Sequence, residues 1–187
     1  PFYAVEALSH HLITPSSRIY DKGTFQLPHT KLVFRDWKLG GHGWVNVTKA
    51  IIVSCDTFFY NLAVKMGIAF MDNALYDFHF DQPTHIDMQE ELGGLVPTPA
   101  WKKSHQSQPW YTGDTIITGI GQGSLLTTPV QLASATATLA TRGKQYTPML
   151  VMRQTAPGKQ AILTPPTLNS TLHLDDPTAW KTVIDAM

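Results

Sequence analysis

Apolar residues recur at three- and four-residue spacing in six stretches of the chain, which is the spacing typical of helices with one buried face. The clearest stripe, which includes Phe58, Leu62 and Met66, is followed by Gly67, a residue that commonly ends helices. Asp176 is expected to cap the last helix. The six predicted helices are residues 2–11, 48–53, 57–66, 70–78, 129–143 and 177–187.

Two long stretches lack a sustained period. Residues 16–46 are rich in Gly, Pro and aromatic side chains and predict a long loop with at most a short hairpin, and residues 93–123 are equally irregular. Weak alternation over 146–152 predicts a strand, and residues 156–166 predict a Pro/Gly loop. The expected fold class is therefore mainly α with little strand.

Composition narrows the function. The chain has 187 residues, 43% of them hydrophobic, which is enough for a core and excludes a disordered protein. Lys+Arg and Asp+Glu both number 14, so the basic excess typical of nucleic-acid binders is absent, and no apolar run reaches the roughly 18 residues of a membrane span. A helical pattern runs into both ends, Pro1 and Met187, so we expect a piece of a longer protein.

The single cysteine, Cys55, stands in the triplet Ser54-Cys55-Asp56, immediately before the predicted helix over 57–66. It cannot form an internal disulfide, so it is a buried thiol, a reactive thiol or a metal ligand. Asp56 fits a simple helix cap, worth about 1 kcal/mol. If the segment is extended or a turn, Ser54 and Asp56 face a cleft and Cys55 points inward. The cap and the cleft interpretations are compatible.

A set of metal-ligand side chains lies in or beside the first irregular stretch: Asp21, Asp36, His42 and Cys55. Two carboxylates, an imidazole and a thiol suit tetrahedral Zn²⁺, although their spacing fits no familiar zinc finger or ribbon. The alternative is a buried Cys, a surface His and two turn aspartates. A long aperiodic loop needs something to hold it, which favours the metal.

A glycine run and three aromatic residues each have two interpretations, one structural and one functional. The glycine run over 119–123 has neither the spacing nor the Lys-Ser/Thr of a phosphate loop, so we expect a tight turn that at most shapes a cleft wall. Trp101, Trp110 and Tyr111 form either an aromatic binding wall or pins that hold a loop to the core. The remaining histidines show no metal-site spacing.

Several blocks along the chain together resemble one family. They are residues 14–21, Arg35-Asp36-Trp37, Gly41-His42-Gly43, residues 54–60, residues 109–116, residues 119–123 and residues 128–131. The chain closely resembles the penicillin-binding protein 2 branch of the Gram-negative penicillin-binding proteins over nearly its whole length, and the early blocks are specific to that branch.

The resemblance implies a peptidoglycan D,D-transpeptidase that cross-links stem peptides in the periplasm through a serine acyl-enzyme and is inhibited by β-lactams. Such enzymes carry Ser-x-x-Lys, Ser-x-Asn/Asp and Lys-Thr/Ser-Gly motifs. Ser54-Cys55-Asp56 matches the second. The first would lie just before Pro1 and the third beyond Met187, so residues 1–187 are expected to be a partial transpeptidase domain, inactive alone, from the α/β serine β-lactamase-like fold.

The resemblance also implies residue roles and partners. Ser54 would relay a proton, Asp56 would orient the substrate or the relay, and Asp21, Asp36, His42 and Cys55 would hold a structural zinc. Expected partners are stem peptides, β-lactams, RodA and other cell-elongation proteins, with no nucleic acid and an inner-membrane anchor outside this chain. The rival is a non-catalytic, zinc-stabilised scaffold or an antibiotic-sensing relative. A sensor would keep Ser-x-x-Lys, whereas a scaffold need not.

Overall fold

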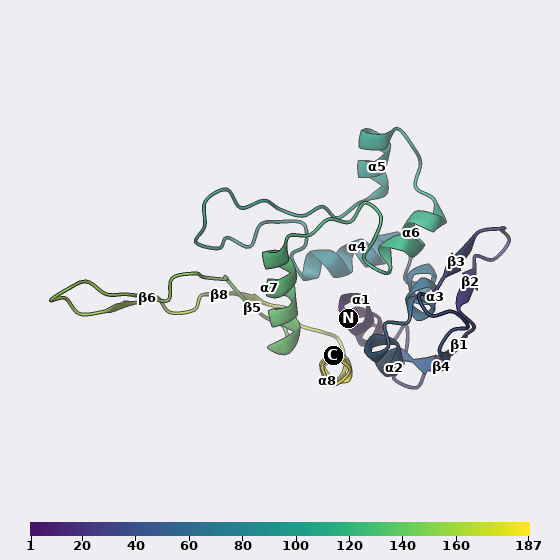
Figure 1. Cartoon of the computed structure of the whole chain (residues 1–187), viewed down its shortest axis with the longest axis horizontal. Coiled ribbons are helices and arrows are strands. Elements are labelled where there is room, and N and C mark those ends of the chain that lie inside the picture. The colour runs from purple at the N-terminus through teal and green to yellow at the C-terminus, as the bar shows by residue number, and fades with distance from the viewer.

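Helices make up most of the regular structure in the computed structural model, which describes residues 1–187 (Figure 1). They are α1 (Phe2–Ser9), α2 (Val47–Ile52), α3 (Asp56–Met66), α4 (Ile68–Asp77), α5 (Pro99–Gln106), α6 (Thr112–Thr118), α7 (Pro129–Ala140) and α8 (Thr178–Ile184). The strands form four antiparallel pairs, β1–β4, β2–β3, β5–β8 and β6–β7. The expected class, mainly α with little strand, is confirmed.

The core surrounds α1, which lies centrally in Figure 1. Every residue of α1 from Tyr3 to Ser9 is buried, as expected of a helix that neighbours cover on all sides. It packs against α4 and α8. The ring of Phe2 contacts those of Phe78 and Phe80, with centroids 5.0 and 5.1 Å apart. The first helix of the sequence therefore forms the centre of this fold.

The prediction of a loop with at most one hairpin over 16–46 is wrong in part. Four short strands lie there: β1 (Arg18–Asp21) pairs with β4 (Gly43–Asn46), and β2 (Thr24–Gln26) pairs with β3 (Val33–Arg35). Strands of three or four residues are too short to show alternation in a sequence. At Gly41 (φ 75°), a Cβ would lie 2.3 Å from the Asp21 carbonyl oxygen, so only glycine fits this crossing.

Residues 93–123 are also more regular than predicted, because they contain α5 and α6. Thr98 Oγ1 accepts a hydrogen bond from Trp101 N, and Pro99 stands in the first turn, which is a helix start signal. The apolar spacing missed α5 because only Lys102 of this helix is buried. In Figure 1, α5 projects from the body.

The C-terminal third contains the clearest errors. Of the predicted strand over 146–152, only Tyr146 is in a strand, at the end of β5 (Lys144–Tyr146), which pairs with β8 (Leu168–Thr171). The predicted loop over 156–166 contains β7 (Ile162–Leu163), paired with β6 (Arg153–Gln154). These pairs form the long arm of Figure 1. The expectation that Asp176 is the cap residue of α8 (Thr178–Ile184) is wrong, because Pro177 is the N-cap residue; Asp176 lies one residue earlier, and its Oδ1 accepts a hydrogen bond from Thr178 N at 2.9 Å.

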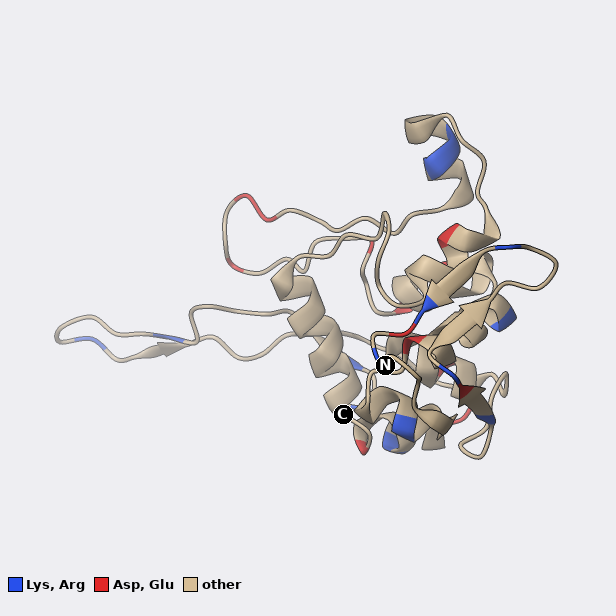
Figure 2. Ribbon diagram, turned by 45° about the vertical axis from the view of Figure 1, so that its right-hand side comes forward, with Lys and Arg blue, Asp and Glu red and all other residues tan.

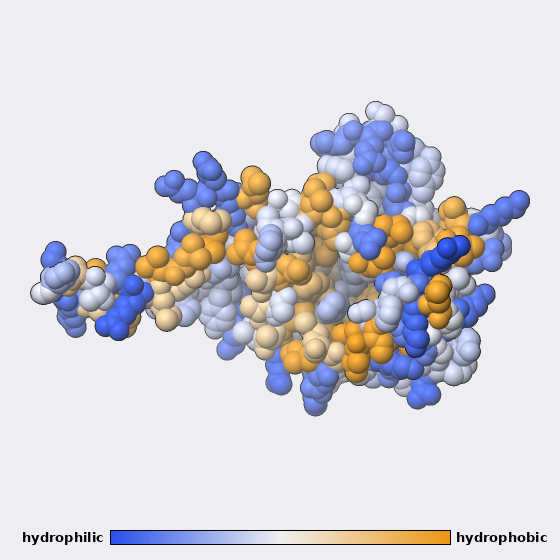
Figure 3. All heavy atoms as spheres, in the orientation of Figure 1, coloured by the Kyte–Doolittle hydropathy of each residue, from blue (hydrophilic) through white to orange (hydrophobic).

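Charged residues are scattered over the ribbon without a single-sign stripe (Figure 2). Apolar side chains are exposed across the middle of the face in Figure 3, while the tip of the arm is hydrophilic. No helix combines the length and the apolar character required to cross a membrane.

Helix α6 packs closely on α3 at Gly119. A Cβ there would lie 2.6 Å from Ala63 Cβ and 3.2 Å from the Phe59 carbonyl oxygen. We therefore expect Gly119→Ala to lower the free energy of unfolding by about 1–3 kcal/mol through overpacking, measured by chemical denaturation. Gly113→Ala, inside α6, which Gly119 caps, is the control, because its Cβ would meet only Phe34 Cζ, at 3.8 Å. Equal midpoints for the two variants would contradict this packing.

Candidate active site and metal site

The Ser54–Asp56 triplet forms the junction between α2 and α3. Ser54 N donates to the Ile51 carbonyl at 3.2 Å, and Cys55 N donates to the Ala50 carbonyl at 2.9 Å. These two hydrogen bonds are the pair that defines a Schellman C-cap. Ser54 occupies the left-handed position of this cap, with φ 51°. Glycine is usual there, and a side chain costs about 1–2 kcal/mol. The junction therefore holds a strained serine.

The orientation predicted for the triplet is found. Cys55 is 0% exposed, whereas Ser54 and Asp56 line a cavity of about 470 Å³ together with Pro1, the first residue of the chain. Of the two backbone forms considered, extended or a turn, the segment adopts the turn, with Ser54 left-handed. The glycine turn that follows α6 forms another wall through Gly119 to Gly121, the cleft-wall role expected for it.

The expectation that Asp56 caps α3 is wrong. Cys55 is the N-cap residue, and Asp56 is the first residue of the helix. Its Oδ2 instead accepts a hydrogen bond from Trp37 N at 3.2 Å. Burial, and next the charge of Asp36, raise the pKa of the Asp56 carboxyl. A carboxylate in the first helical turn also interacts favourably with the helix dipole.

The four predicted metal ligands meet beneath this turn. Asp21 ends β1, Asp36 follows β3, His42 precedes β4, and Cys55 joins α2 to α3. One ligand atom from each lies within 4.8 Å of the others. His42 Nδ1 lies 2.8 Å from Asp21 Oδ2 and 3.5 Å from Asp36 Oδ1, and Cys55 Sγ lies 3.4 Å from Asp21 Oδ2.

The donor atoms and their spacing fit a metal ion. Bond lengths of about 2.0–2.3 Å place neighbouring ligands of a tetrahedral zinc roughly 3.3–3.8 Å apart. The separations of 3.5 and 3.4 Å above lie in this range, whereas the 2.8 Å between His42 Nδ1 and Asp21 Oδ2 is a hydrogen-bond distance. The Nε2 atom of His42 is buried and has no hydrogen-bond partner, so no protein acceptor binds this ring nitrogen. The group therefore could hold a metal ion.

Backbone hydrogen bonds keep the two carboxylates in place. Gly23 N and His42 N donate to the two oxygens of Asp21 at 2.7 and 2.8 Å, and Lys38 N and Thr57 N donate to those of Asp36. Burial alone would raise the pKa of Asp21, but the hydrogen bonds from the Gly23 backbone and from the ring and backbone of His42 lower it to about 2. Burial, and then the nearby carboxylate charges, raise the pKa of the Cys55 thiol.

Of the three aromatic residues that could have formed a binding wall, Trp110 and Tyr111 act as pins, while Trp101 stacks on His105 of its own helix, α5. Trp110 Nε1 donates to Thr115 Oγ1 at 2.8 Å. Lys102 Nζ lies 5.9 and 5.1 Å from the ring centroids of Trp110 and Tyr111, and 2.6 Å from Asp114 Oδ2. This cluster ties α5 to the start of α6.

Trp37 is a contact of the site that the sequence analysis did not single out. Its indole Nε1 donates to the Ser54 carbonyl at 2.8 Å and to the Val53 carbonyl at 3.2 Å. The sequence signal was its position directly after the candidate ligand Asp36.

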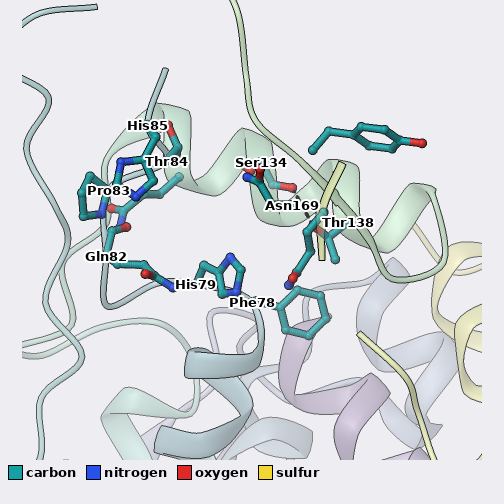
Figure 4. Close-up of a pocket in the computed structure, with 12 residues that line it drawn as sticks. Phe78, His79, Gln82, Pro83, Thr84, His85, Ser134, Thr138 and Asn169 are labelled. Carbon is teal, nitrogen blue, oxygen red and sulfur yellow. Dashed lines mark hydrogen bonds between the residues drawn. The ribbon is translucent and has the colours of Figure 1, made fainter. Parts of the chain in front are cut away.

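A second cavity, of about 190 Å³, lies beside α7 and shares no lining residue with the first (Figure 4). His79 and His85 from the loop after α4 face Ser134 and Thr138 of α7 across it, with Asn169 of β8 nearby. No carboxylate, ammonium or guanidinium side chain lines it. None of the predicted site residues contributes to it.

Comparison with known proteins identifies the family of this chain. The family described as penicillin binding protein transpeptidase domain matches residues 1–187. The peptidoglycan D,D-transpeptidase MrdA of Salmonella typhimurium is 41% identical over 100% of this chain and 30% of its own length, and that of Haemophilus influenzae is 46% identical over 81% of this chain and 23% of its own. The chain thus spans less than a third of these relatives.

Solved structures of penicillin-binding proteins share the fold of this chain. Pseudomonas aeruginosa PBP2, determined in complex with WCK 5153, has a TM-score of 0.86 and 38% identity over 100% of this chain and 40% of its own. PBP2 from Helicobacter pylori, determined in complex with MreC, has a TM-score of 0.80 and 31% identity over 100% of this chain and 33% of its own. The chain therefore belongs to the penicillin-binding protein transpeptidase family, in its penicillin-binding protein 2 (MrdA) branch.

Proposed function

We propose that the protein to which this chain belongs cross-links peptidoglycan stem peptides through a serine acyl-enzyme, and that β-lactams acylate the same serine. The main support is one juxtaposition: Ser54 and Asp56 line the cavity that Pro1 also lines. A Ser-x-x-Lys motif directly before Pro1 would then enter the cavity beside Ser54. In this proposal, acylation requires that serine and lysine.

The chemistry assigns a role to each residue. A serine hydroxyl is a weak nucleophile until a neighbouring base takes its proton. The upstream serine attacks the donor peptide carbonyl, the C–N bond to the terminal D-Ala breaks, and the leaving amine takes up the proton. Ser54, exposed at the cavity, passes that proton between the nucleophile, its lysine and the amine. Asp56 orients the relay or the substrate by hydrogen bonds. An acceptor amine then attacks the acyl-enzyme carbonyl, the ester C–O bond to the serine breaks, and the serine oxygen takes up the proton that the amine loses, which completes the cross-link.

Labelled penicillin tests this proposal on the full-length protein. We expect a covalent adduct on the serine of the upstream Ser-x-x-Lys motif, found by mass spectrometry of peptides. Absence of an adduct on folded protein would overturn the proposal and favour a non-catalytic scaffold. An adduct without cross-linking of stem peptides would instead identify an antibiotic-sensing relative.

We further propose that Asp21, Asp36, His42 and Cys55 hold a structural Zn²⁺. Their ligand atoms lie within 4.8 Å of one another, and two buried carboxylates beside a thiol attract a divalent cation. All four positions are taken by side chains, which leaves no open site for an activated water and favours a structural role. A bound ion would join β1, the loop after β3, the residue before β4 and the α2–α3 junction.

Location and partners follow from the same proposal. We expect these residues in the periplasm, in a protein anchored in the inner membrane, and assembled with RodA and other elongation proteins. The Helicobacter pylori relative solved with MreC supports a partner of this kind. Copurification of RodA with the full-length protein is the direct check.

A further inference from the structure

We propose that Trp37 is a positioning residue for the proposed transpeptidation: it fixes the direction of the Ser54 hydroxyl by holding the Ser54–Asp56 turn. This inference rests on the proposed function. Trp37 itself does not line the cavity, so it acts through the turn rather than on the substrate.

Trp37 contacts both ends of the turn. Its indole N–H is shared between the carbonyls of Val53 (3.2 Å) and Ser54 (2.8 Å), and its backbone N–H donates to Asp56 Oδ2 (3.2 Å). Val53 is the C-cap residue of α2, and the Ser54 carbonyl lies beyond the helix end, where carbonyls lack intrahelical donors. One side chain therefore supplies the donor that both carbonyls need.

The turn needs such support because it is strained. Ser54 adopts φ 51°, a conformation that a residue with a side chain keeps only where its surroundings hold it. A bond to the Ser54 carbonyl restricts rotation of the peptide unit that follows Ser54. Because that rotation would relax the left-handed turn and redirect the Ser54 side chain, the indole bond preserves the direction of the hydroxyl.

Burial in the core does not explain why a tryptophan stands at position 37. The residue is 64% exposed, and its ring centroid lies 5.4 Å from that of His42. Its neighbour Asp36 accepts a bond from Thr57 N at 3.1 Å, so residues 36 and 37 together hold residues 53–57. An exposed Trp whose polar hydrogen is directed at a catalytic turn is better explained by that bond than by packing.

The test replaces the indole N–H and measures acylation of the full-length protein by labelled penicillin. Trp37→Phe removes the donor and keeps the backbone N–H, and benzothienylalanine at the same position removes only the donor while keeping the ring shape. We expect the acylation rate constant at saturating penicillin to fall about 10-fold, the effect of losing one bond that orients a reacting group. The dissociation constant of penicillin, the melting temperature and the metal content should stay near parental values.

Trp44→Phe is the matched control. Trp44 lies on the neighbouring strand β4, is 62% exposed and packs edge-on against Tyr20. We expect it to be acylated at the parental rate. Equal rates for the parent and the Trp37 variants, or equal losses in Trp37→Phe and Trp44→Phe, would overturn the positioning role. A parent that is never acylated would instead overturn the proposed function itself, and this role with it.

Discussion

Replacing Ser54 by alanine in the full-length protein is expected to slow acylation by labelled penicillin by about 10²–10⁴-fold, the usual effect of removing a group that transfers a proton in the transition state. The fold should persist, because Ser54 is exposed and its neighbour Cys55 forms the buried part of the turn. The measurement is the acylation rate constant, with circular dichroism to verify folding. Parental acylation of Ser54→Ala would remove Ser54 from the relay.

Ser54→Gly makes the same chemical deletion but has a different effect on the backbone. At φ 51°, glycine has no Cβ to strain the chain, whereas alanine keeps it. Both variants should lose acylation equally, while the glycine variant should be more stable than the alanine variant by about 1 kcal/mol. Chemical denaturation measures the difference, and equal stabilities would contradict the strained turn. The pair thus separates the chemical role of the hydroxyl from the conformational cost of holding it.

Helical spacing located the elements that build the core, and its failures have a physical pattern. The helices over 47–52, 56–66 and 129–140 have one face against the interior, so the spacing of their apolar residues could be recognised. Helix α5 is mostly exposed and lacks that signal. The strands over 18–46 are paired by contacts between residues far apart, such as Asp21 with Gly43, which no local pattern contains.

In the candidate site, too, local features could be predicted from the sequence and tertiary contacts could not. Residue chemistry alone identified the four ligand types, and the triplet spacing gave the inward direction of Cys55. The meeting of Asp21 and Cys55 depends on strand pairing and on the α2–α3 junction, which are tertiary. The local sequence places Trp37 beside the candidate ligand Asp36 but does not reveal its role, because the carbonyls that it contacts are 16 and 17 residues further along the chain.

Removing the thiol of Cys55 is expected to remove the proposed zinc and to destabilise the protein strongly. In Cys55→Ala, the buried carboxylates of Asp21 and Asp36 would keep their hydrogen bonds but lose the cation, and removing one partner of a buried charge pair costs roughly 3–5 kcal/mol. Elemental analysis should find about one zinc per parent chain and little in the variant. Equal metal in both proteins would exclude Cys55 from the site. No metal in either would show a hydrogen-bonded cluster without an ion.

Chelation separates loss of the ion from loss of packing. A strong chelator should lower the melting temperature of the parent but not that of Cys55→Ala, which has no ion to lose. His173→Ala, a change at an exposed histidine outside the group, should behave as the parent does. Because Cys55 lies between Ser54 and Asp56, the chelated parent should also be acylated more slowly, and added zinc should restore that rate in the parent alone. Recovery in the variant as well would place the ion elsewhere.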